Sequence, residues 1–219
     1  MDAVTRKIPS HEVTYARLRD LVLFGHLAPG APVTIQGLIS DLGAGMTPVR
    51  EAIRRLTADG ALLPQGNRRV SVPHLTLGLL EQVAFARLTI EPKLAELAAT
   101  HLNPALIDRL QGLDNLVDQA IRAGNVPGYL AANHAFHFAL YEVSEAAVLV
   151  DMAQSLWLRF GPSLRVVCSR YGQAALPDRH SEALAAMRAG DPIALARAIE
   201  RDIEQGVDQV RLAILQGEI

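Results

Sequence analysis

The stretch GAGMTPVREAIRRL, residues 43–56, determines how the first third of the chain is interpreted. Its Gly-Ala-Gly start is typical of the end of one helix and the turn before the next. Thr47 is a favourable N-cap, and Pro48 suits the first helical position because its missing N–H has no helical partner there. We therefore expect a helix that begins at Pro48, ends near Asp59 and carries three arginines at helical spacing.

The segments around this helix predict a winged helix-turn-helix. Thr34 can cap a short preceding helix that runs through Leu42, and the 61–72 segment, ALLPQGNRRVSV, indicates two extended segments around a Gly-Asn turn. A first helix that ends at Gly25 is predicted by a set of apolar residues, namely Val13, Ala16, Leu21 and Phe24. Three helices followed by a hairpin is the order of elements in a winged helix.

The rest of the chain has helical periodicity and short connections. The predicted helices are 76–100, 104–123, 128–144, 146–170, 178–189 and 191–216. Such a pattern is typical of a helical bundle. The expected fold is mainly α: a winged helix-turn-helix over 1–73, followed by an all-α bundle of six to seven helices over 74–219.

Composition and charge agree with a globular protein of two parts. Half of the 219 residues are apolar, the single cysteine is Cys168, and no segment has the length of a signal peptide core or a membrane span, so we expect a cytoplasmic protein. The net charge is −2, but residues 1–73 carry nine Lys or Arg against six Asp or Glu, whereas the remainder carries twelve against seventeen. This asymmetry suggests that the two parts have different partners.

Basic side chains of the first part are placed as a DNA-binding surface requires. Arg50 and Arg54 share a helix face with Thr47 at its tip, and the opposite face carries the apolar residues Val49, Ile53 and Leu56. Arg68 and Arg69 fall at the hairpin tip, where a wing meets the DNA backbone or minor groove. The alternative is a solvated helix whose arginines pair with Glu51 and Asp59, and charge alone does not decide between the two.

Polar residues on the apolar faces of the bundle suggest a metal site. Asn133 and His137 are four residues apart on one helix, and His180 and Asp202 lie at similar distances on either side of the turn at 190–192. These side chains can converge from three helices. Two imidazoles and two oxygen donors suit a divalent ion such as Zn²⁺, Ni²⁺ or Mn²⁺. The alternative is a set of packed histidines beside a surface aspartate.

Residues 13–73 resemble the winged helix of the GntR family of bacterial transcription regulators. The matching segments are GHLAPG (25–30), LISDLG (38–43), TPVREAIRRL (47–56), DGAL (59–62) and NRRVSV (67–72). The resemblance implies DNA contacts by Thr47, Arg50, Arg68 and Arg69. The family usually has Ser-Arg before Thr-Pro, where this chain has Gly45-Met46.

This departure predicts an altered operator sequence. Met46 can contact a thymine methyl group, but it cannot form the bidentate hydrogen bonds that arginine makes with guanine. Gln36 is a candidate for a replacement contact to a phosphate or a base, and the alternative is an ordinary surface glutamine.

The second part resembles the FCD effector-binding domain of the FadR-type subfamily, over ARLTIEPKLAELAA (86–99), NHAFHFALYE (133–142) and HSEALAAMRAGDPIALARAIERDI (180–203). In many members an aspartate and three histidines hold a metal. The resemblance places these ligands at Asn133, His137, His180 and Asp202, so two of the four are altered. A neutral amide is a weak ligand, which implies a lower metal affinity.

The same resemblance assigns cavity positions to Arg87 and Glu91. Arg87 is expected to hold an effector carboxylate bidentately, and the alternative is an intrahelical pair with Glu91. Further candidates for the cavity wall are Trp157, Arg165 and Tyr171.

Together these patterns predict a homodimeric regulator that binds a palindromic operator and responds to a small carboxylate. By analogy with the family, we expect repression that the metabolite releases. Two alternatives remain, a metal-dependent hydrolase and an effector-independent DNA-binding protein. The chain has no GxSxG, HExxH, P-loop or dinucleotide-binding glycine pattern, so we expect no enzymatic activity.

Overall fold

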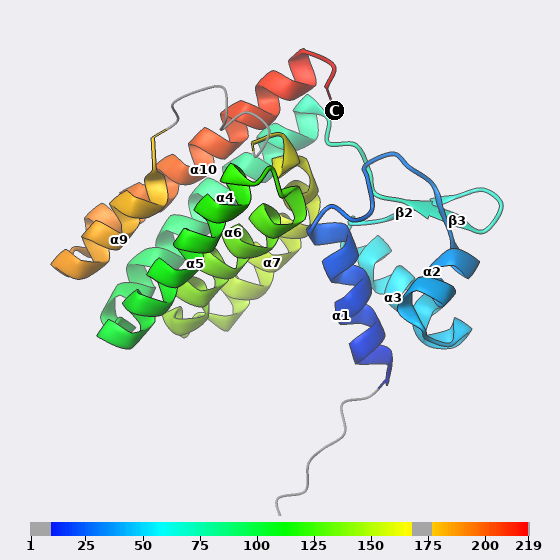
Figure 1. Cartoon of the computed structure of the whole chain (residues 1–219), viewed down its shortest axis with the longest axis horizontal. Coiled ribbons are helices and arrows are strands. Elements are labelled where there is room, and N and C mark those ends of the chain that lie inside the picture. The colour runs from blue at the N-terminus through cyan, green and yellow to red at the C-terminus, as the bar shows by residue number, and fades with distance from the viewer. Residues whose placement is uncertain (1–9, 168–176, 219) are drawn as a thin grey trace, which may run out of the picture. The chain divides into compact units, whose positions relative to one another are not determined.

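The computed structural model describes residues 10–167 and 177–218, so Cys168 and Tyr171 lie outside the described residues. The chain divides into two compact units, Met1–His74 and Leu75–Ile219 (Figure 1). The first is a winged helix-turn-helix and the second is an all-α bundle. The predicted fold class is confirmed. No helix among the described residues is long and apolar enough to cross a membrane.

The first unit contains three helices and a small sheet. Its elements in chain order are α1 (Ser10–Leu23), β1 (Val33–Thr34), α2 (Ile35–Leu42), α3 (Met46–Ala58), β2 (Leu63–Gln65) and β3 (Arg69–Ser71). The strands are antiparallel in the order β1-β3-β2, and Val70 lies opposite both Val33 and Pro64. Pro64 is tolerated because β2 is an edge strand. The sequence did not predict β1, which is only two residues long.

Helix α3 begins two residues before the expected position, so the prediction of Thr47 as its N-cap is wrong. Gly45 is the N-cap in extended conformation, and the first helical bond runs from the Val49 N–H to the Gly45 carbonyl at 3.3 Å. Pro48 is therefore the third helical residue. The first N–H groups of a helix, through about its first turn, have no hydrogen-bond partner within the helix. Proline is therefore tolerated throughout the first turn and does not mark the first residue of the helix.

The predicted first helix forms, but it ends at Leu23 rather than at Gly25, and its buried residues are not the four apolar residues from which the sequence predicts it. Leu18 and Val22 are fully buried, together with Thr14 and Leu23, whereas Val13 is 42% exposed. Leucines and valines occur on two sides of this helix, and the side that packs on α3 has the i, i+4 spacing of Thr14, Leu18 and Val22. By contrast, the predicted caps of α2 are confirmed: the Thr34 hydroxyl accepts from the Gly37 N–H, and Gly43 ends the helix with φ +57°.

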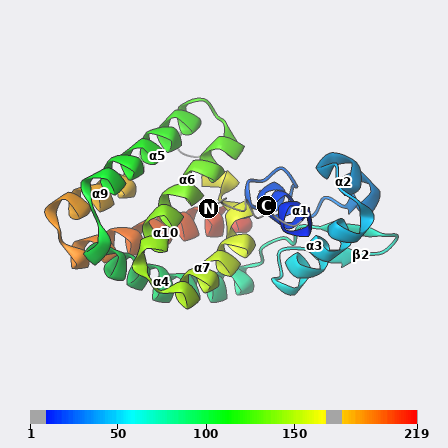
Figure 2. The ribbon, with the colours of Figure 1, turned by 90° about the horizontal axis from the view of Figure 1, so that it is seen from below.

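The second unit is built from six long helices within its described residues. They are α4 (Leu77–Ala98), α5 (Pro104–Arg122), α6 (Val126–Tyr141), α7 (Ala147–Phe160), α9 (Arg179–Ala189) and α10 (Pro192–Leu215), with the short 3₁₀ helices η1 (Ala99–His101), η2 (Glu142–Ser144) and η3 (Gly161–Leu164). Helix α4 packs on α10, α6 and α7, while α5 packs on α6 and α9, and α9 packs on α10 (Figure 2). These six helices thus surround a common interior.

Candidate metal centre and nucleic-acid interface

Helix α3 separates an apolar face from a polar one, as the sequence predicts. Its buried residues are Val49, Ala52, Ile53 and Leu56, and they pack toward α1 and α2. Thr47, Arg50 and Arg54 are exposed on the other side. The positive end of the helix dipole adds to these side chains at the N-terminus, where a phosphate is favoured.

The three arginines of α3 have different partners. Arg54 donates to both carboxylate oxygens of Glu51, at 2.9 and 2.7 Å. Arg55 pairs with Glu12 at 2.9 Å and stacks on the Tyr15 ring, with 3.7 Å between Cζ and the ring centroid. Only Arg50 is exposed and has no acidic partner among the residues that the structure describes. The predicted solvated pairing therefore applies to Arg54, while Arg50 remains available for DNA.

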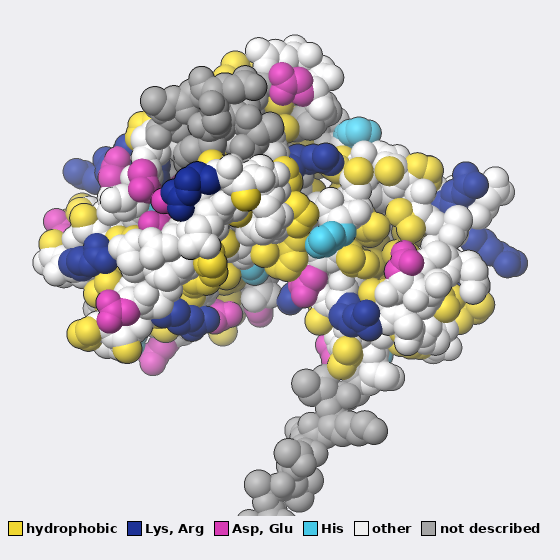
Figure 3. All heavy atoms as spheres, in the orientation of Figure 1, with side chains coloured by type: hydrophobic (Ala, Val, Ile, Leu, Met, Phe, Trp, Pro, Cys, Tyr) yellow, Lys and Arg dark blue, Asp and Glu magenta, His cyan; other side chains and the backbone are white. Residues whose placement is uncertain are grey.

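The hairpin forms a protruding basic tip. Arg68 and Arg69 are exposed, and Figure 3 shows Lys and Arg side chains projecting where the β2–β3 hairpin ends. Gln36 is exposed in the first turn of α2, and Met46 is 50% exposed at the N-terminus of α3. The unit thus presents all the predicted DNA-binding side chains to solvent.

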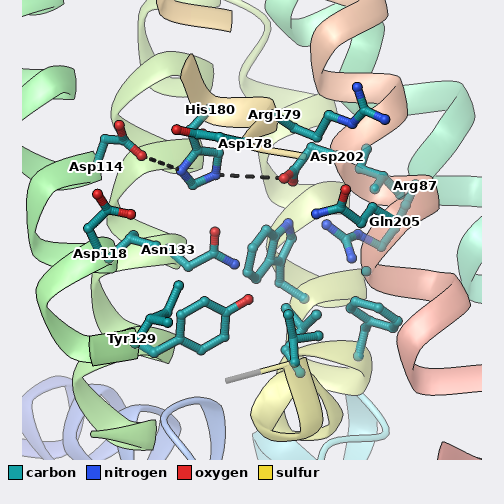
Figure 4. A pocket seen from close by; sticks show the side chains of 18 residues that line it. Arg87, Asp114, Asp118, Tyr129, Asn133, Asp178, Arg179, His180, Asp202 and Gln205 are labelled. Atoms are coloured by element: carbon teal, nitrogen blue, oxygen red, sulfur yellow. Dashed lines mark hydrogen bonds and ion pairs between the residues drawn. The ribbon is translucent and has the colours of Figure 1, made fainter. Parts of the chain in front are cut away.

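A polar cavity of about 70 Å³ lies inside the bundle, enough for a few water molecules or a small organic ligand. Figure 4 shows its labelled polar side chains pointing toward a shared interior. Helix α5 contributes Asp114 and Asp118, and α6 contributes Tyr129 and Asn133. The opposite side contains Arg87 from α4, with Trp157 of α7, His180 of α9 and Asp202 of α10 completing the polar wall.

Three of the four predicted metal ligands form one cluster. The ligand atoms of His137, His180 and Asp202 all lie within 4.8 Å of one another. His137 Nε2 is 3.1 Å from Asp202 Oδ2 and 3.4 Å from His180 Nε2. Asn133, the fourth, lines the cavity beside them, and its amide points into it.

Neighbouring side chains fix which nitrogen of His137 faces the cluster. Tyr141 donates its hydroxyl proton to Glu91 Oε2 at 2.8 Å, so its oxygen accepts from His137 Nδ1 at 3.0 Å. Burial and the Glu91 charge hold the pKa of Tyr141 well above its usual value, which keeps that proton in place. The Nε2 lone pair of His137 is therefore directed at the cluster.

His180 is oriented in the same way by Asp114. Its Nδ1 lies 3.1 Å from Asp114 Oδ1, which can only accept, so Nδ1 carries the hydrogen and Nε2 faces His137 and Asp202. A carboxylate behind a ligating imidazole is the usual outer-shell arrangement of metal sites. Sequence reasoning missed Asp114, although its position within the apolar i, i+4, i+7 stripe Leu110, Asp114 and Val117 marks it as buried.

The arrangement brings three acceptor groups together with no donor between them. Two imidazole lone pairs and a carboxylate repel one another unless a cation or a proton lies between them. Burial lowers the pKa of His137 and so favours its neutral, metal-binding form, although the nearby Asp202 carboxylate opposes the shift. Without a metal, a proton held between Asp202 and the rings of His137 and His180 outweighs the burial of Asp202 and lowers the pKa of its carboxyl group to about 2, so Asp202 stays charged. The donor set therefore fits a divalent metal ion.

Arg87 and Glu91 form the predicted intrahelical pair inside the protein. Arg87 is 2% exposed and donates through Nε and Nη2 to the two oxygens of Glu91, while its guanidinium lies between the rings of Trp157 and Phe160. Arg87 lines the cavity; Glu91 lies behind that wall and also accepts from Trp157 Nε1 at 3.0 Å. Among the other candidates, Trp157 lines the cavity, whereas Arg165 is not among the described lining residues.

Family models match both units. Residues 11–72 match the model described as "Bacterial regulatory proteins, gntR family", and residues 82–205 match the FCD domain. The chain belongs to the GntR family. It carries an FCD domain, as the sequence resemblance predicted.

Similar proteins support this assignment over nearly the whole chain. The HTH-type transcriptional regulator McbR of Escherichia coli is 29% identical over 87% of both chains. The protein named "Probable D-xylose utilization operon transcriptional repressor" of Paenarthrobacter nicotinovorans is 26% identical over 88% of this chain and 86% of its own. The solved structure of E. coli McbR/YncC has a TM-score of 0.84 at 26% identity and covers 94% of this chain. This GntR protein is a transcription regulator and not an enzyme.

Asp114 provides a test of the candidate metal centre in this GntR regulator. The Asp114→Asn substitution preserves shape but replaces a charged acceptor of the His180 Nδ1–H with a neutral one. We expect zinc affinity to fall about tenfold, the lower end of the range for outer-shell partners. Competition with a chromophoric chelator measures the change.

The matched control for this substitution is Asp108→Asn. Asp108 is exposed on the same helix and does not line the cavity. Equal zinc affinities for the Asp114 variant and the wild type would contradict the assignment of Asp114 as the residue that orients His180.

Proposed function

We propose that this GntR regulator is a homodimeric repressor whose binding to a palindromic operator is controlled by a small carboxylate held beside a divalent metal in the FCD cavity. The convergence of His137, His180 and Asp202 on one point, with Arg87 lining the same cavity, carries the proposal. The exposed basic side chains of α3 and the wing supply its DNA-binding half.

The two-fold symmetry of the proposal follows from the geometry of DNA. One recognition helix covers only a few base pairs, and a dimer places two such helices on half-sites about one turn apart. Arg50 and Thr47 are the side chains proposed to reach base edges, with Arg54 beside them. Arg68, Arg69 and Gln36 are proposed to contact the backbone or the minor groove. The name of the Paenarthrobacter relative favours repression.

The metal is proposed to be held by His137, His180 and Asp202, with Asn133 as a weaker fourth donor. A Zn²⁺, Ni²⁺ or Mn²⁺ ion there would supply an electrophilic anchor for an anion. The protein's own contribution is to hold both imidazoles in the required tautomer and to present Arg87. An effector acts on DNA binding only if it binds one arrangement of the dimer more tightly than another.

Removal of the metal tests this centre. We expect purified protein to contain about one divalent ion per chain and to melt several degrees lower after chelation, because zinc at 100 times its Kd stabilises by about 2.7 kcal/mol. Elemental analysis and a thermal melt with and without added zinc measure both effects. Absence of metal together with a chelator-insensitive melt would contradict the metal centre and leave the DNA-binding proposal intact.

A further inference from the structure

Glu91 is a buried carboxylate that accepts hydrogen bonds from three side chains. It is fully buried, and its two oxygens accept from Nε and Nη2 of Arg87, from the Tyr141 hydroxyl at 2.8 Å and from Trp157 Nε1 at 3.0 Å. As the ion-pair partner of a guanidinium, Glu91 has no hydrogen of its own to donate. Each of these neighbours therefore has to direct a hydrogen at Glu91.

Tyr141 is the one member of these three that can also accept. Guanidinium and indole N–H groups are donors only, whereas a phenol oxygen can donate or accept. The Tyr141 oxygen lies between Glu91 Oε2 and His137 Nδ1, which is 3.0 Å away. When the hydroxyl donates to Glu91, its oxygen accepts from His137, and the hydrogen of the neutral ring is on Nδ1. When the hydroxyl donates to His137 instead, that hydrogen is on Nε2.

The second arrangement is satisfied without a metal and cannot bind one. An Nε2–H group of His137 would donate to Asp202 Oδ2, which lies 3.1 Å away, so both atoms would have a partner. The lone pair that a metal requires would then be on Nδ1, directed at Tyr141 and away from the cluster. Of the two hydrogen-bond patterns that the described side chains allow, only the first presents a lone pair to the metal.

We propose that Glu91 is a positioning residue of the metal centre, which acts through Tyr141 to keep the hydrogen of His137 on Nδ1. The inference rests on the proposed function, since it concerns the metal of the same cavity. Glu91 is not a member of the ligand cluster, and two hydrogen bonds separate it from the His137 ring. The same carboxylate holds Arg87 by its Nε–Nη2 edge at the cavity wall. One buried group thus positions both a metal ligand and the cationic side chain proposed to meet the effector.

Glu91→Gln tests the inference because glutamine keeps the shape and adds an NH₂ group. With three donors around it, this NH₂ group is best accommodated by Tyr141, the neighbour that can accept. Tyr141 then donates to His137, and the ring hydrogen faces Asp202. We expect zinc affinity to fall about 100-fold, the upper end of the range for outer-shell partners.

Tyr141→Phe should weaken zinc binding less than Glu91→Gln does, and it should partly rescue it. Phenylalanine neither fixes nor opposes the required tautomer of His137, so we expect a loss of about tenfold. In the double variant Glu91→Gln/Tyr141→Phe, nothing donates to Nδ1 from this side. Its zinc affinity should therefore return to within about tenfold of the wild type, the level of Tyr141→Phe alone.

Competition of the full-length proteins with a chromophoric chelator for zinc measures all four affinities. A role of Glu91 in packing alone predicts the opposite order, because a second change in the core would add to the loss. A double variant that binds zinc more weakly than both single variants, or a Glu91→Gln variant with wild-type affinity, would overturn the inference and leave the metal centre standing. A wild type that binds no zinc would refute the metal centre and the inference together.

Two further variants keep the test interpretable. Glu96→Gln makes the same change on α4 at an exposed side chain outside the cavity and should bind zinc like the wild type. Glu91→Gln leaves the buried Arg87 guanidinium unbalanced, which is destabilising, so a charge-balanced variant, Arg87→Met/Glu91→Leu, repeats the comparison if Glu91→Gln does not fold. Tyr141 then retains His137 as its hydrogen-bond partner among the described residues, and zinc binding should again be weak and be restored by Tyr141→Phe. Failure of Tyr141→Phe to restore it would overturn the inference.

Discussion

Replacing His137 with alanine is expected to abolish stoichiometric metal binding. His137 is fully buried, and its Nε2 is the ligand atom nearest to both Asp202 and His180. Loss of an outer-shell partner alone lowers metal affinity about 10- to 100-fold, so loss of a ligand should lower it by at least about 100-fold. Elemental analysis after gel filtration, followed by a chelator competition, measures the loss.

The alanine also leaves a void in the core, so a second variant separates folding from binding. Asp202→Asn removes one ligand charge at a side chain that is 20% exposed and should weaken zinc binding with little change in the melt of the metal-free protein. His101→Ala, at an exposed histidine outside the cluster, is the matched control. Retention of one zinc per chain in the His137 variant would refute the three-ligand centre.

Arg50→Ala has the second large expected effect, on DNA binding. Arg50 is exposed on α3 without an acidic partner among the described residues, so its removal should not disturb the fold. If Arg50 reads a base, we expect the substitution to weaken the free energy of DNA binding by about 1–3 kcal/mol per protomer. If Arg50 contacts a phosphate, we expect the salt dependence of DNA binding to decrease by about one ion per protomer. Fluorescence anisotropy on a labelled duplex at several salt concentrations distinguishes the two.

Two further variants, Arg54→Ala and Arg109→Ala, test whether the effect is specific to Arg50. Arg54 is engaged by Glu51, so we expect a smaller loss than for Arg50. Arg109 is exposed on α5 in the other unit, and its replacement should leave DNA binding unchanged. An Arg50 variant with wild-type affinity and salt dependence would refute the assignment of α3 as the recognition helix.

The fold could be predicted from sequence wherever capping and periodicity agreed. Thr34 and Gly43 delimit α2 as expected, and the long apolar periods located all six helices of the bundle. The errors occurred where two positions were chemically acceptable. Pro48 is allowed anywhere in the first helical turn, and the apolar residues of α1 do not indicate which of two faces packs on α3.

The candidate site was predictable as a set of residue types but not as a network. Helical spacing and the helix hairpin brought His137, His180 and Asp202 together. The contact of Asp114 with His180 joins two helices across 66 residues of sequence, which helical period does not reveal. Tyr141 lies four residues from His137 on the same helix, but that spacing alone does not identify a hydrogen bond. The pair of Arg87 and Glu91 was foreseen as an alternative, whereas its burial between two aromatic rings required the packed bundle.

The most direct test of the central claim is to let the full-length protein select binding sites from a pool of random DNA duplexes. We predict enrichment of a palindrome whose half-sites lie about one helical turn apart, and its disappearance when Arg50→Ala is used. Because Met46 occupies the position before Thr-Pro, the enriched half-site should favour thymine at the base that it faces. Selection of no two-fold symmetric site, or the same site by the Arg50 variant, would contradict the account.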